Sequence, residues 1–267
     1  MRRGWFLMVA LATAACGGQT SSSGDSGAGD AQALDAADGG DGASFGSITF
    51  QNDTTTQKAG AFAVFYADAQ QAGAGCTTQG SLGSCTLAEC PVVASGPYAS
   101  AGTVTVSFGS QPPFALTQAS SGAYMSTPAA SFAKGDVLGV SASGGDIPAF
   151  GEQTITAPGA LVFGSPQAPF VISTTADLNV TWSGGEPGAQ AVVGVMVSGS
   201  TSLAVSCSFD ATLGTGTVPA SLVSPLKAAQ GTPMVSLGQV RHTTFDAGAL
   251  KIDLGAIQST VQSATLQ

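Results

Sequence analysis

Apolar and polar residues alternate with a period of two along much of this chain. The clearest example is the stretch 103–108, where Val104, Val106 and Phe108 alternate with threonine and serine. Successive side chains of a β-strand point to opposite faces of its sheet, so this period predicts strands with one buried face. Further predicted strands are 47–50, 61–67, 84–93, 137–142, 177–183, 192–197, 202–209 and 250–254.

Turn signals separate these strands. They are Pro112-Pro113, Ser121-Gly122, Gly144-Gly145 and Gly184-Gly185. Charged residues make up only 9% of the chain, against roughly 25% in an ordinary soluble domain, which leaves little material for exposed helix faces. The one segment with helical character is 219–229, and Pro225 limits its length. Short strands with frequent turns predict an all-β chain of one or two β-sandwich modules.

The N-terminus has the features of a bacterial export signal. Arg2 and Arg3 precede the uncharged stretch 4–15, which is shorter than the roughly 20 residues that span a bilayer. The stretch runs into the sequence TAACG, which resembles the lipobox of bacterial lipoproteins, with threonine at the position that is usually leucine. We predict that 1–15 is a lipoprotein signal peptide and that Cys16 carries fatty acyl chains such as palmitate. The alternative is an ordinary secretory signal that leaves Cys16 as a free thiol.

Residues 17–44 are rich in glycine, serine and aspartate, and Leu34 is their only large apolar side chain. Such a segment cannot bury enough surface to offset the entropy of ordering it. We predict that 16–44 is the lipidated cysteine followed by a disordered tether, with an r.m.s. span of about 30 Å. The predicted location is the bacterial cell envelope, with a lipid anchor in the outer membrane. The alternative is a soluble secreted protein.

Acidic side chains dominate the charge. The formal net charge is −9, and residues 45–267 alone hold five basic and eleven acidic side chains, a net of −6. Nucleic-acid binding needs a basic stripe on the protein. We therefore expect no nucleic-acid partner. The predicted partner is a membrane, through the N-terminal lipid, and a protein or glycan partner stays unidentified.

A short proline-containing segment, 164–168, is the best internal boundary. It divides the body into a predicted module at 45–163 and a second at 169–267, each of a size that suits one sandwich. One merged sandwich is the alternative.

Several stretches resemble uncharacterised secreted or outer-envelope lipoproteins of the myxobacterial type. They are LNVTWSGG (178–185), VSCSF (205–209), GTGTVP (214–219), GSCTLAEC (83–90), AGTVTV (101–106) and IPAF (147–150). The resemblance covers most of 45–267 and implies immunoglobulin-like β modules in an exported lipoprotein. Its motifs belong to strands and turns, so it implies no activity. The Cys…Trp…Cys framework of antibody domains is absent, because no cysteine precedes Trp182 within the second predicted module.

Four cysteines follow Cys16. An even number in an exported protein predicts disulfides. Cys85 and Cys90 are five residues apart and would face opposite sides of one strand, so they are not expected to pair together. We expect one local bridge from Cys76 to Cys85 or to Cys90. The remaining cysteine could then pair with Cys207, or both could stay buried thiols.

No known catalytic motif is present: the chain has no G-x-S-x-G, H-E-x-x-H, P-loop or dinucleotide-binding fingerprint. His242 is the only histidine, and we place it in a loop or at a strand end. Asp136 and Asp146 follow glycines and are expected in turns, and Glu152 in a loop. We therefore predict no catalytic, cofactor-binding or metal-binding residues, and no cofactor.

The aromatic residues suggest one alternative role. Glycan binding uses exposed rings beside polar groups, and Tyr98 and Tyr124 are the candidate exposed rings, whereas Trp182 is patterned toward a core. The favoured hypothesis is a non-catalytic, membrane-anchored structural or binding protein. The second is a module that binds glycans or small ligands. The third is a secreted hydrolase that uses His242 or two carboxylates.

Overall fold

β-Strands are the predominant secondary structure of the described residues. The computed structural model describes residues 45–66, 76–91, 98–126, 129–199 and 201–267. The predicted signal peptide, Cys16 and the predicted tether lie outside these residues. The described fold consists of three sheets, one short helical segment and a separate 3₁₀ turn. The prediction of an all-β, sandwich-type chain is confirmed.

The largest sheet has twelve strands. Its main order is β3 (Thr77–Leu82), β4 (Cys85–Pro91), β16 (Thr201–Asp210), β15 (Gln190–Ser198), β18 (Thr232–Ala247), β19 (Leu250–Leu266), β1 (Phe45–Asp53), β2 (Lys58–Tyr66), β8 (Tyr124–Met125) and β7 (Thr117–Gln118). The strand β13 (Phe170–Ile172) also pairs with β19, and β9 (Ala129–Ala130) pairs with β2. We call this assembly the long sheet.

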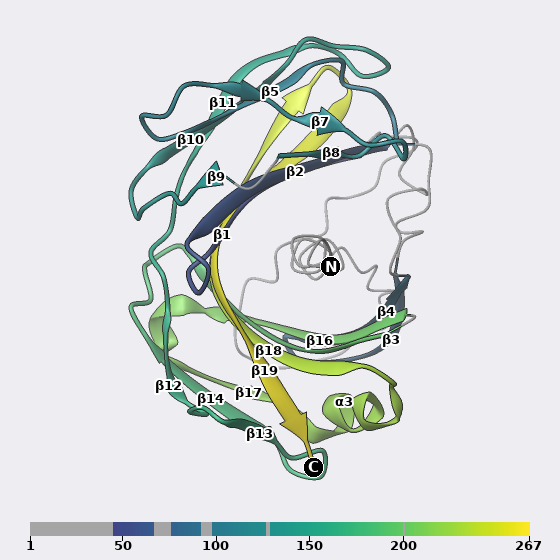
Figure 1. Cartoon of the computed structure of the whole chain (residues 1–267), viewed down its shortest axis with the longest axis vertical. Coiled ribbons are helices and arrows are strands. Elements are labelled where there is room, and N and C mark those ends of the chain that lie inside the picture. Colours follow the sequence, from purple (N-terminus) through teal and green to yellow (C-terminus); the bar gives the residue numbers. More distant parts are fainter. Residues whose placement is uncertain (1–44, 67–75, 92–97, 127–128, 200) are drawn as a thin grey trace, which may run out of the picture.

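The long sheet is curved, and the smaller sheets cover its convex face (Figure 1). One end is covered by β11 (Phe150–Thr156), β10 (Val137–Ala142), β5 (Val104–Phe108) and β6 (Phe114–Ala115). The other end is covered by β12 (Val162–Ser165), β14 (Leu178–Ser183) and β17 (Thr215–Val218). The helical segment comprises α3 (Ala220–Val223) and the 3₁₀ helix η2 (Ser224–Ala228), and a second 3₁₀ turn, η1 (Ala211–Leu213), follows β16. The helical prediction for 219–229 is thus confirmed.

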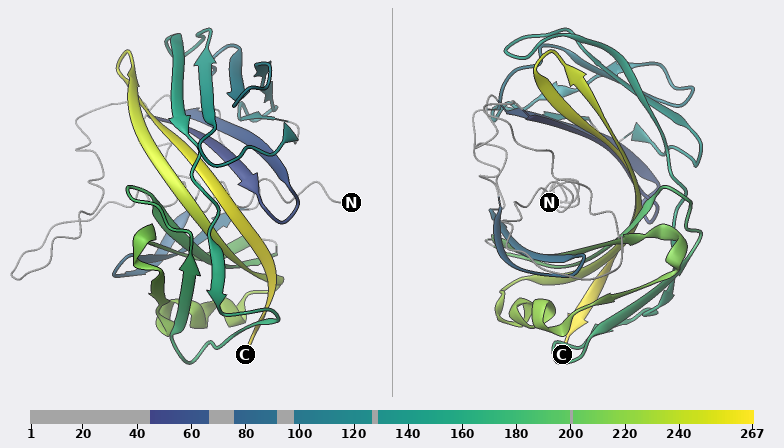
Figure 2. Two further views of the ribbon diagram at one scale, coloured as in Figure 1. Left: turned by 90° about the vertical axis from the view of Figure 1, so that its left-hand side faces the viewer. Right: turned by 180° about the vertical axis from the view of Figure 1, so that it is seen from behind.

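The hairpin of β18 and β19 runs the whole length of the molecule (Figure 2). Its strands have 16 and 17 residues and pair in one unbroken antiparallel register. The alternating pattern predicted only 250–254 of this hairpin. The prediction that His242 lies in a loop or at a strand end is wrong, because His242 lies well inside β18, opposite Gly255.

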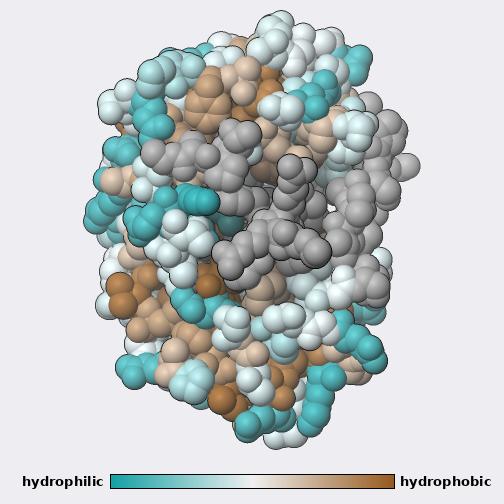
Figure 3. Space-filling view, in the orientation of Figure 1, coloured by the Kyte–Doolittle hydropathy of each residue, from teal (hydrophilic) through white to brown (hydrophobic). Residues whose placement is uncertain are grey.

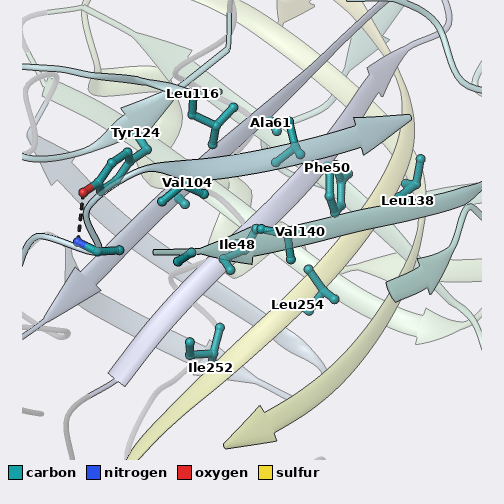
Figure 4. Packing of buried hydrophobic residues seen from close by; sticks show 14 of the residues in the cluster. Ile48, Phe50, Ala61, Val104, Leu116, Tyr124, Leu138, Val140, Ile252 and Leu254 are labelled. Atoms are coloured by element: carbon teal, nitrogen blue, oxygen red, sulfur yellow. Dashed lines mark hydrogen bonds between the residues drawn. The ribbon is translucent and has the colours of Figure 1, made fainter. Parts of the chain in front are cut away.

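The first core lies between the long sheet and the four-stranded sheet (Figure 4). It is rich in aromatic rings, which meet edge to face in the pairs Phe50–Phe108, Phe65–Tyr124 and Phe108–Phe132. Aromatic rings prefer such offset contacts because of their quadrupoles.

The second core lies between the other half of the long sheet, the three-stranded sheet and α3. Val193, Val195 and Val197 of β15 face it, and Leu226 of η2 closes it. Trp182 is buried here, as predicted, and its indole N–H donates to the carbonyl of Ala211 at 2.8 Å.

Three amide side chains mark the border between the cores. Asn52, Gln258 and Gln239 are cross-strand neighbours on β1, β19 and β18. Gln258 donates to the carbonyl of Pro158 at 2.8 Å, and Gln239 donates to that of Gly159 at 3.1 Å. These amides satisfy the backbone of the segment that passes from one small sheet to the other, as a buried connection requires.

The predicted boundary at 164–168 begins at the end of β12. Strands from both sides of it share the long sheet: β1 pairs with β19, and β4 pairs with β16. The cores likewise exchange residues, since Leu254 belongs to the first and Leu87 to the second. The division into modules at 45–163 and 169–267, with one merged sandwich as the alternative, stays a prediction.

Two disulfides are present, Cys76–Cys90 and Cys85–Cys207. This is one of the pairings left open by the sequence, and Cys85 and Cys90 do not pair together. Cys85 and Cys207 are direct cross-strand neighbours on the core side of β4 and β16. Cys90 lies on the opposite face of β4, because it is an odd number of residues from Cys85.

Candidate functional site

The only histidine, His242, lies beside an aspartate on the long sheet. His242 Nδ1 lies 3.3 Å from Asp253 Oδ2, and both side chains are partly exposed. Ser47 is the cross-strand neighbour of Asp253 on β1. Within the described residues, no serine hydroxyl is recorded in a hydrogen bond with this histidine. The structure therefore brings together an Asp–His pair but not a complete nucleophile–base–acid arrangement.

The three candidate carboxylates have local roles. Asp136 accepts a hydrogen bond from the backbone N–H of Ala133 at 2.8 Å, and Asp146 accepts one from Ser100 at 2.8 Å. Both follow glycines as expected for turn residues. Glu152 lies in β11, so its predicted place in a loop is wrong.

The two candidate aromatic residues differ. Tyr124 is 1% exposed, so the expectation that its ring is exposed is wrong. Its hydroxyl accepts the backbone N–H of Ala101 at 2.8 Å (Figure 4). A buried tyrosine needs such a partner, and here it fixes the loop before β5. The period-two rule did not reach Tyr124, because β8 has only two residues.

Tyr98 is half-buried and packs edge to face against Tyr66, with ring centroids 5.3 Å apart. Burial, followed by the charge of Tyr98 and a hydrogen bond to it, raises the pKa of Tyr66 to about 12. Burial also raises the pKa of Tyr98. The pair offers one small, partly exposed aromatic surface.

A charged cluster lies beside the border of the cores. Glu186 Oε1 lies 2.7 Å from Lys134 Nζ, and Glu186 Oε2 lies 3.0 Å from Arg241 Nη2. Burial raises the pKa of Glu186, but hydrogen bonds from Lys134 and the N–H of Gly159, with the charges of Lys134 and Arg241, leave it below its usual value. Lys134 and Arg241 each pair with one oxygen of the Glu186 carboxylate, which also accepts the N–H of Gly159. The cluster therefore stabilises the connection between the two smaller sheets.

Neither of the smaller sheets covers the concave face of the long sheet (Figure 1). Residues that alternate with the core residues form it. On β15, for example, Val192, Gly194 and Met196 lie opposite in direction to Val193 and its core neighbours. In the middle of the face, Val192, Met234, Val240, Ile257 and Val261 pack together.

Small residues surround this apolar cluster. Gly194, Gly238 and Gly255 lie on the concave face of three adjacent strands. A methyl group added to Gly238 would lie 3.1 Å from Cδ1 of Ile257, and one added to Gly194 would collide with Oγ of Ser236. Neighbouring side chains thus lean over the glycines, and the sheet curves toward the side with the smaller residues.

Methionine is confined to this face within the described residues. The chain has five methionines, of which Met1 and Met8 lie in the predicted signal peptide. Met196 and Met234 are cross-strand neighbours. Met125 pairs with Phe62 on the face opposite the core residue Tyr124. Methionine is flexible and polarizable, and it is used where a surface must adapt to a ligand.

A small pocket of about 50 Å³ opens near one end of the concave face. It is lined by Thr49, Gln51, Gly60, Phe62, Met125 and Ser126. Gln51 is the cross-strand neighbour of Ile257, so the pocket adjoins the apolar cluster. Sequence reasoning missed this surface. The signal was methionine at alternate positions to core residues, which becomes informative only once the strands are paired.

On the face of the molecule shown in Figure 3, hydrophilic and hydrophobic residues are interspersed among the described residues. Within the described ranges, no group of three or more histidine, cysteine, aspartate or glutamate side chains is arranged to hold a metal ion. None of the described helices has the length and apolar character needed to cross a membrane. No family model matches the chain, and no curated protein is significantly similar to it.

Proposed function

We propose that this chain is a non-catalytic binding protein of the bacterial cell envelope, anchored to the outer membrane through acyl chains on Cys16. The concave face of the long sheet is its binding surface. The observation that carries this proposal is the confinement of the body's methionines to that face, beside the pocket at Phe62 and Met125. The resemblance of 45–267 to exported lipoproteins supports the location.

The anchor is supported by the export signal, the lipobox-like TAACG and the glycine- and serine-rich segment that follows. Stable attachment needs two acyl chains, because a single chain gives only reversible binding. A segment of the tether's composition would separate the body from the membrane surface.

The intact mass of the native protein, extracted from membranes, tests the anchor. The expected mass is that of residues 16–267 plus acyl chains, with two hydrogens gained on reduction for each of the two disulfides. A mass without acyl chains that begins near Cys16 would contradict the anchor and favour the soluble secreted alternative.

Glycan binding is the second candidate function, and the Tyr66–Tyr98 pair favours it. Sugars stack on aromatic faces beside polar groups, and this pair is partly exposed. Binding of envelope glycans to the full chain, and its loss in Tyr98→Ala, would support this alternative. Binding that Tyr98→Ala leaves unchanged would exclude the pair as the platform.

A further inference from the structure

We infer that the ligand of the concave face is the acyl chain of a long-chain fatty acid. The inference rests on the proposed function as a binding protein, and it adds the chemical class of the ligand. The proposed site is the apolar cluster of Val192, Met234, Val240, Ile257 and Val261, together with the neighbouring Met196. We call these six residues the apolar stripe.

The first argument is charge. The stripe lies on β15, β18 and β19, and their charged concave-face residues, such as His242 and Asp253, lie toward one end of the hairpin. Three stripe residues have polar cross-strand neighbours. Gln190 lies opposite Val240, Ser236 lies opposite Val261, and Ser263 lies opposite Met234. None of these is titratable. A charged ligand body would lose its hydration without gaining a partner here, whereas a hydrocarbon loses nothing.

The second argument is the backbone. The strands β15, β18 and β19 are interior strands, each hydrogen-bonded to a neighbour on both sides. Their N–H and C=O groups are therefore engaged in the sheet. A peptide laid on this face would bury its own polar backbone against side chains alone, and buried unpaired amides are costly. A hydrocarbon chain has no such groups.

The third argument is the presence of two unpartnered hydroxyls. Ser259 of β19 and Ser206 of β16 are both more than nine-tenths buried, and neither Oγ has a hydrogen-bond partner in the described part of the chain. Ser206 is the neighbour of Gly194, and Ser259 is the neighbour of Gly238, so both share the concave face. Buried hydroxyls without partners point to a missing polar group. Ser259 is the cross-strand neighbour of Asp53 on β1, whose carboxylate would repel another, so a carboxylate at one end of an acyl chain would accept its hydrogen bond from Ser206.

The fourth argument is the shape of the stripe. Val240 and Ile257 form a buried floor, while Val192 and Met234 remain partly exposed above it. From β19 to β16 the hydroxyl-bearing strands are three steps apart, which is about 14 Å at the usual strand spacing. Between these strands the concave face carries the stripe residues together with Gly194, Ser236 and Gly238, and the flexible thioethers of Met196 and Met234 suit a chain of variable conformation.

The test is the displacement of a dansyl-labelled fatty acid by palmitate from the full chain carrying Cys16→Ser, which cannot be acylated. We expect saturable binding. Met234→Glu places a charge on the stripe and should weaken palmitate binding by at least about tenfold. Val192→Thr keeps the shape of the side chain and adds one hydroxyl, so it should weaken palmitate binding by a smaller factor. This milder variant keeps the test decisive if Met234→Glu does not fold.

The matched control is Leu213→Glu, a charge added at a 64% exposed leucine in η1. It should leave binding unchanged. Absence of saturable palmitate binding would overturn the inference, as would a Val192→Thr variant that binds as tightly as the parent. Tighter binding of a valine-rich peptide than of palmitate would contradict the inference and would indicate a protein partner instead. An acylated native mass together with no palmitate binding would overturn only this inference and leave the proposed anchor in place.

Discussion

The two faces of the long sheet are built from the same strands, yet they do different work. On β15 the convex face presents Val193, Val195 and Val197 to the second core. The concave face of the same strand presents Val192, Gly194 and Met196. One face is filled by side chains of fixed shape that other sheets cover. The other combines small residues, hydroxyls and flexible thioethers.

This difference shows how a sheet with two apolar faces can still assign them separate roles. Branched aliphatic and aromatic side chains have few rotamers and pack tightly, which stabilises the fold. Methionine adapts to a ligand at little loss of packing. Stability should therefore depend on the convex face, and binding on the concave face. The predictions below test this division in order of decreasing effect.

The largest contrast is expected between two phenylalanines of β2. Phe65 is fully buried in the first core, whereas Phe62 lies partly exposed on the concave face. Phe65→Ala should lower the free energy of unfolding by about 3–5 kcal/mol, since it leaves a cavity. Phe62→Ala should cost about 1 kcal/mol. Denaturant unfolding of both variants measures the difference, and equal losses would break the distinction between the faces.

The disulfides offer a second comparison, because each lies on a different face. Cys85–Cys207 closes a sequence separation of 122 residues in the second core, and Cys76–Cys90 closes one of 14. The chain-entropy model assigns stabilisations of about 4–5 and 3 kcal/mol, respectively. The double alanine variants should therefore differ in that direction in thermal or denaturant unfolding. A larger loss without Cys76–Cys90 would contradict it.

The Glu186 cluster on the convex side should give a smaller, pH-dependent effect. Glu186→Gln should lower the free energy of unfolding by about 1–3 kcal/mol at neutral pH, because it weakens hydrogen bonds to charged groups. The pKa of Glu186 is lowered from its usual 4.5. Its stabilisation is therefore present above pH 4.5 and lost as the pH falls through the lowered pKa.

Unfolding measured from pH 6 down through this range should show the parent and Glu186→Gln converging. The matched control is Glu152→Gln, at an exposed carboxylate of β11. Glu152→Gln should run parallel to the parent throughout. Curves of Glu186→Gln that stay parallel to the parent would show that the carboxylate charge does not stabilise the border of the cores.

The smallest effect concerns the tyrosine pair at the end of β2. Burial raises the pKa of Tyr66 from 10 to about 12 together with the charge of Tyr98 and a hydrogen bond to it, and Tyr98→Phe removes these last two contributions. Burial is the larger cause and remains, so the pKa should fall only part of the way. Ultraviolet titration measures it. In the parent, the stability that comes from neutral Tyr66 should be lost as the pH rises from 10 through about 12, and an unchanged pKa in Tyr98→Phe would contradict the contact.

The sequence predicted the strands that border a core on one face. Apolar and polar residues alternate in 104–108 and 178–183 because one face of each strand is buried and the other is at least partly exposed to solvent. It missed most of β18, because Gln239 and Arg241 occupy core-side positions of that strand. These polar residues belong to the border between the cores, a feature that exists only once both sheets are assembled.

The candidate site was harder to predict. The pairing of Cys85 with Cys207 could be named as an option from strand geometry, but the choice depended on which strands are neighbours. The apolar stripe left no local pattern, because β15 is apolar on both faces and reads as a fully buried strand. Met196 and Met234 are 38 positions apart in the chain and meet only through cross-strand pairing.

Methionine methyl NMR of the full chain, labelled with ¹³C at the methyl group, tests the division between the faces most directly. Met125, Met196 and Met234 report on the concave face, and Met1 and Met8 lie in the predicted signal peptide. Addition of palmitate is predicted to shift the resonances of Met196 and Met234 with one common affinity, while the thermal unfolding midpoint rises by ligand linkage. Palmitate binding that leaves both resonances unchanged would contradict the assignment of the concave face as the binding surface.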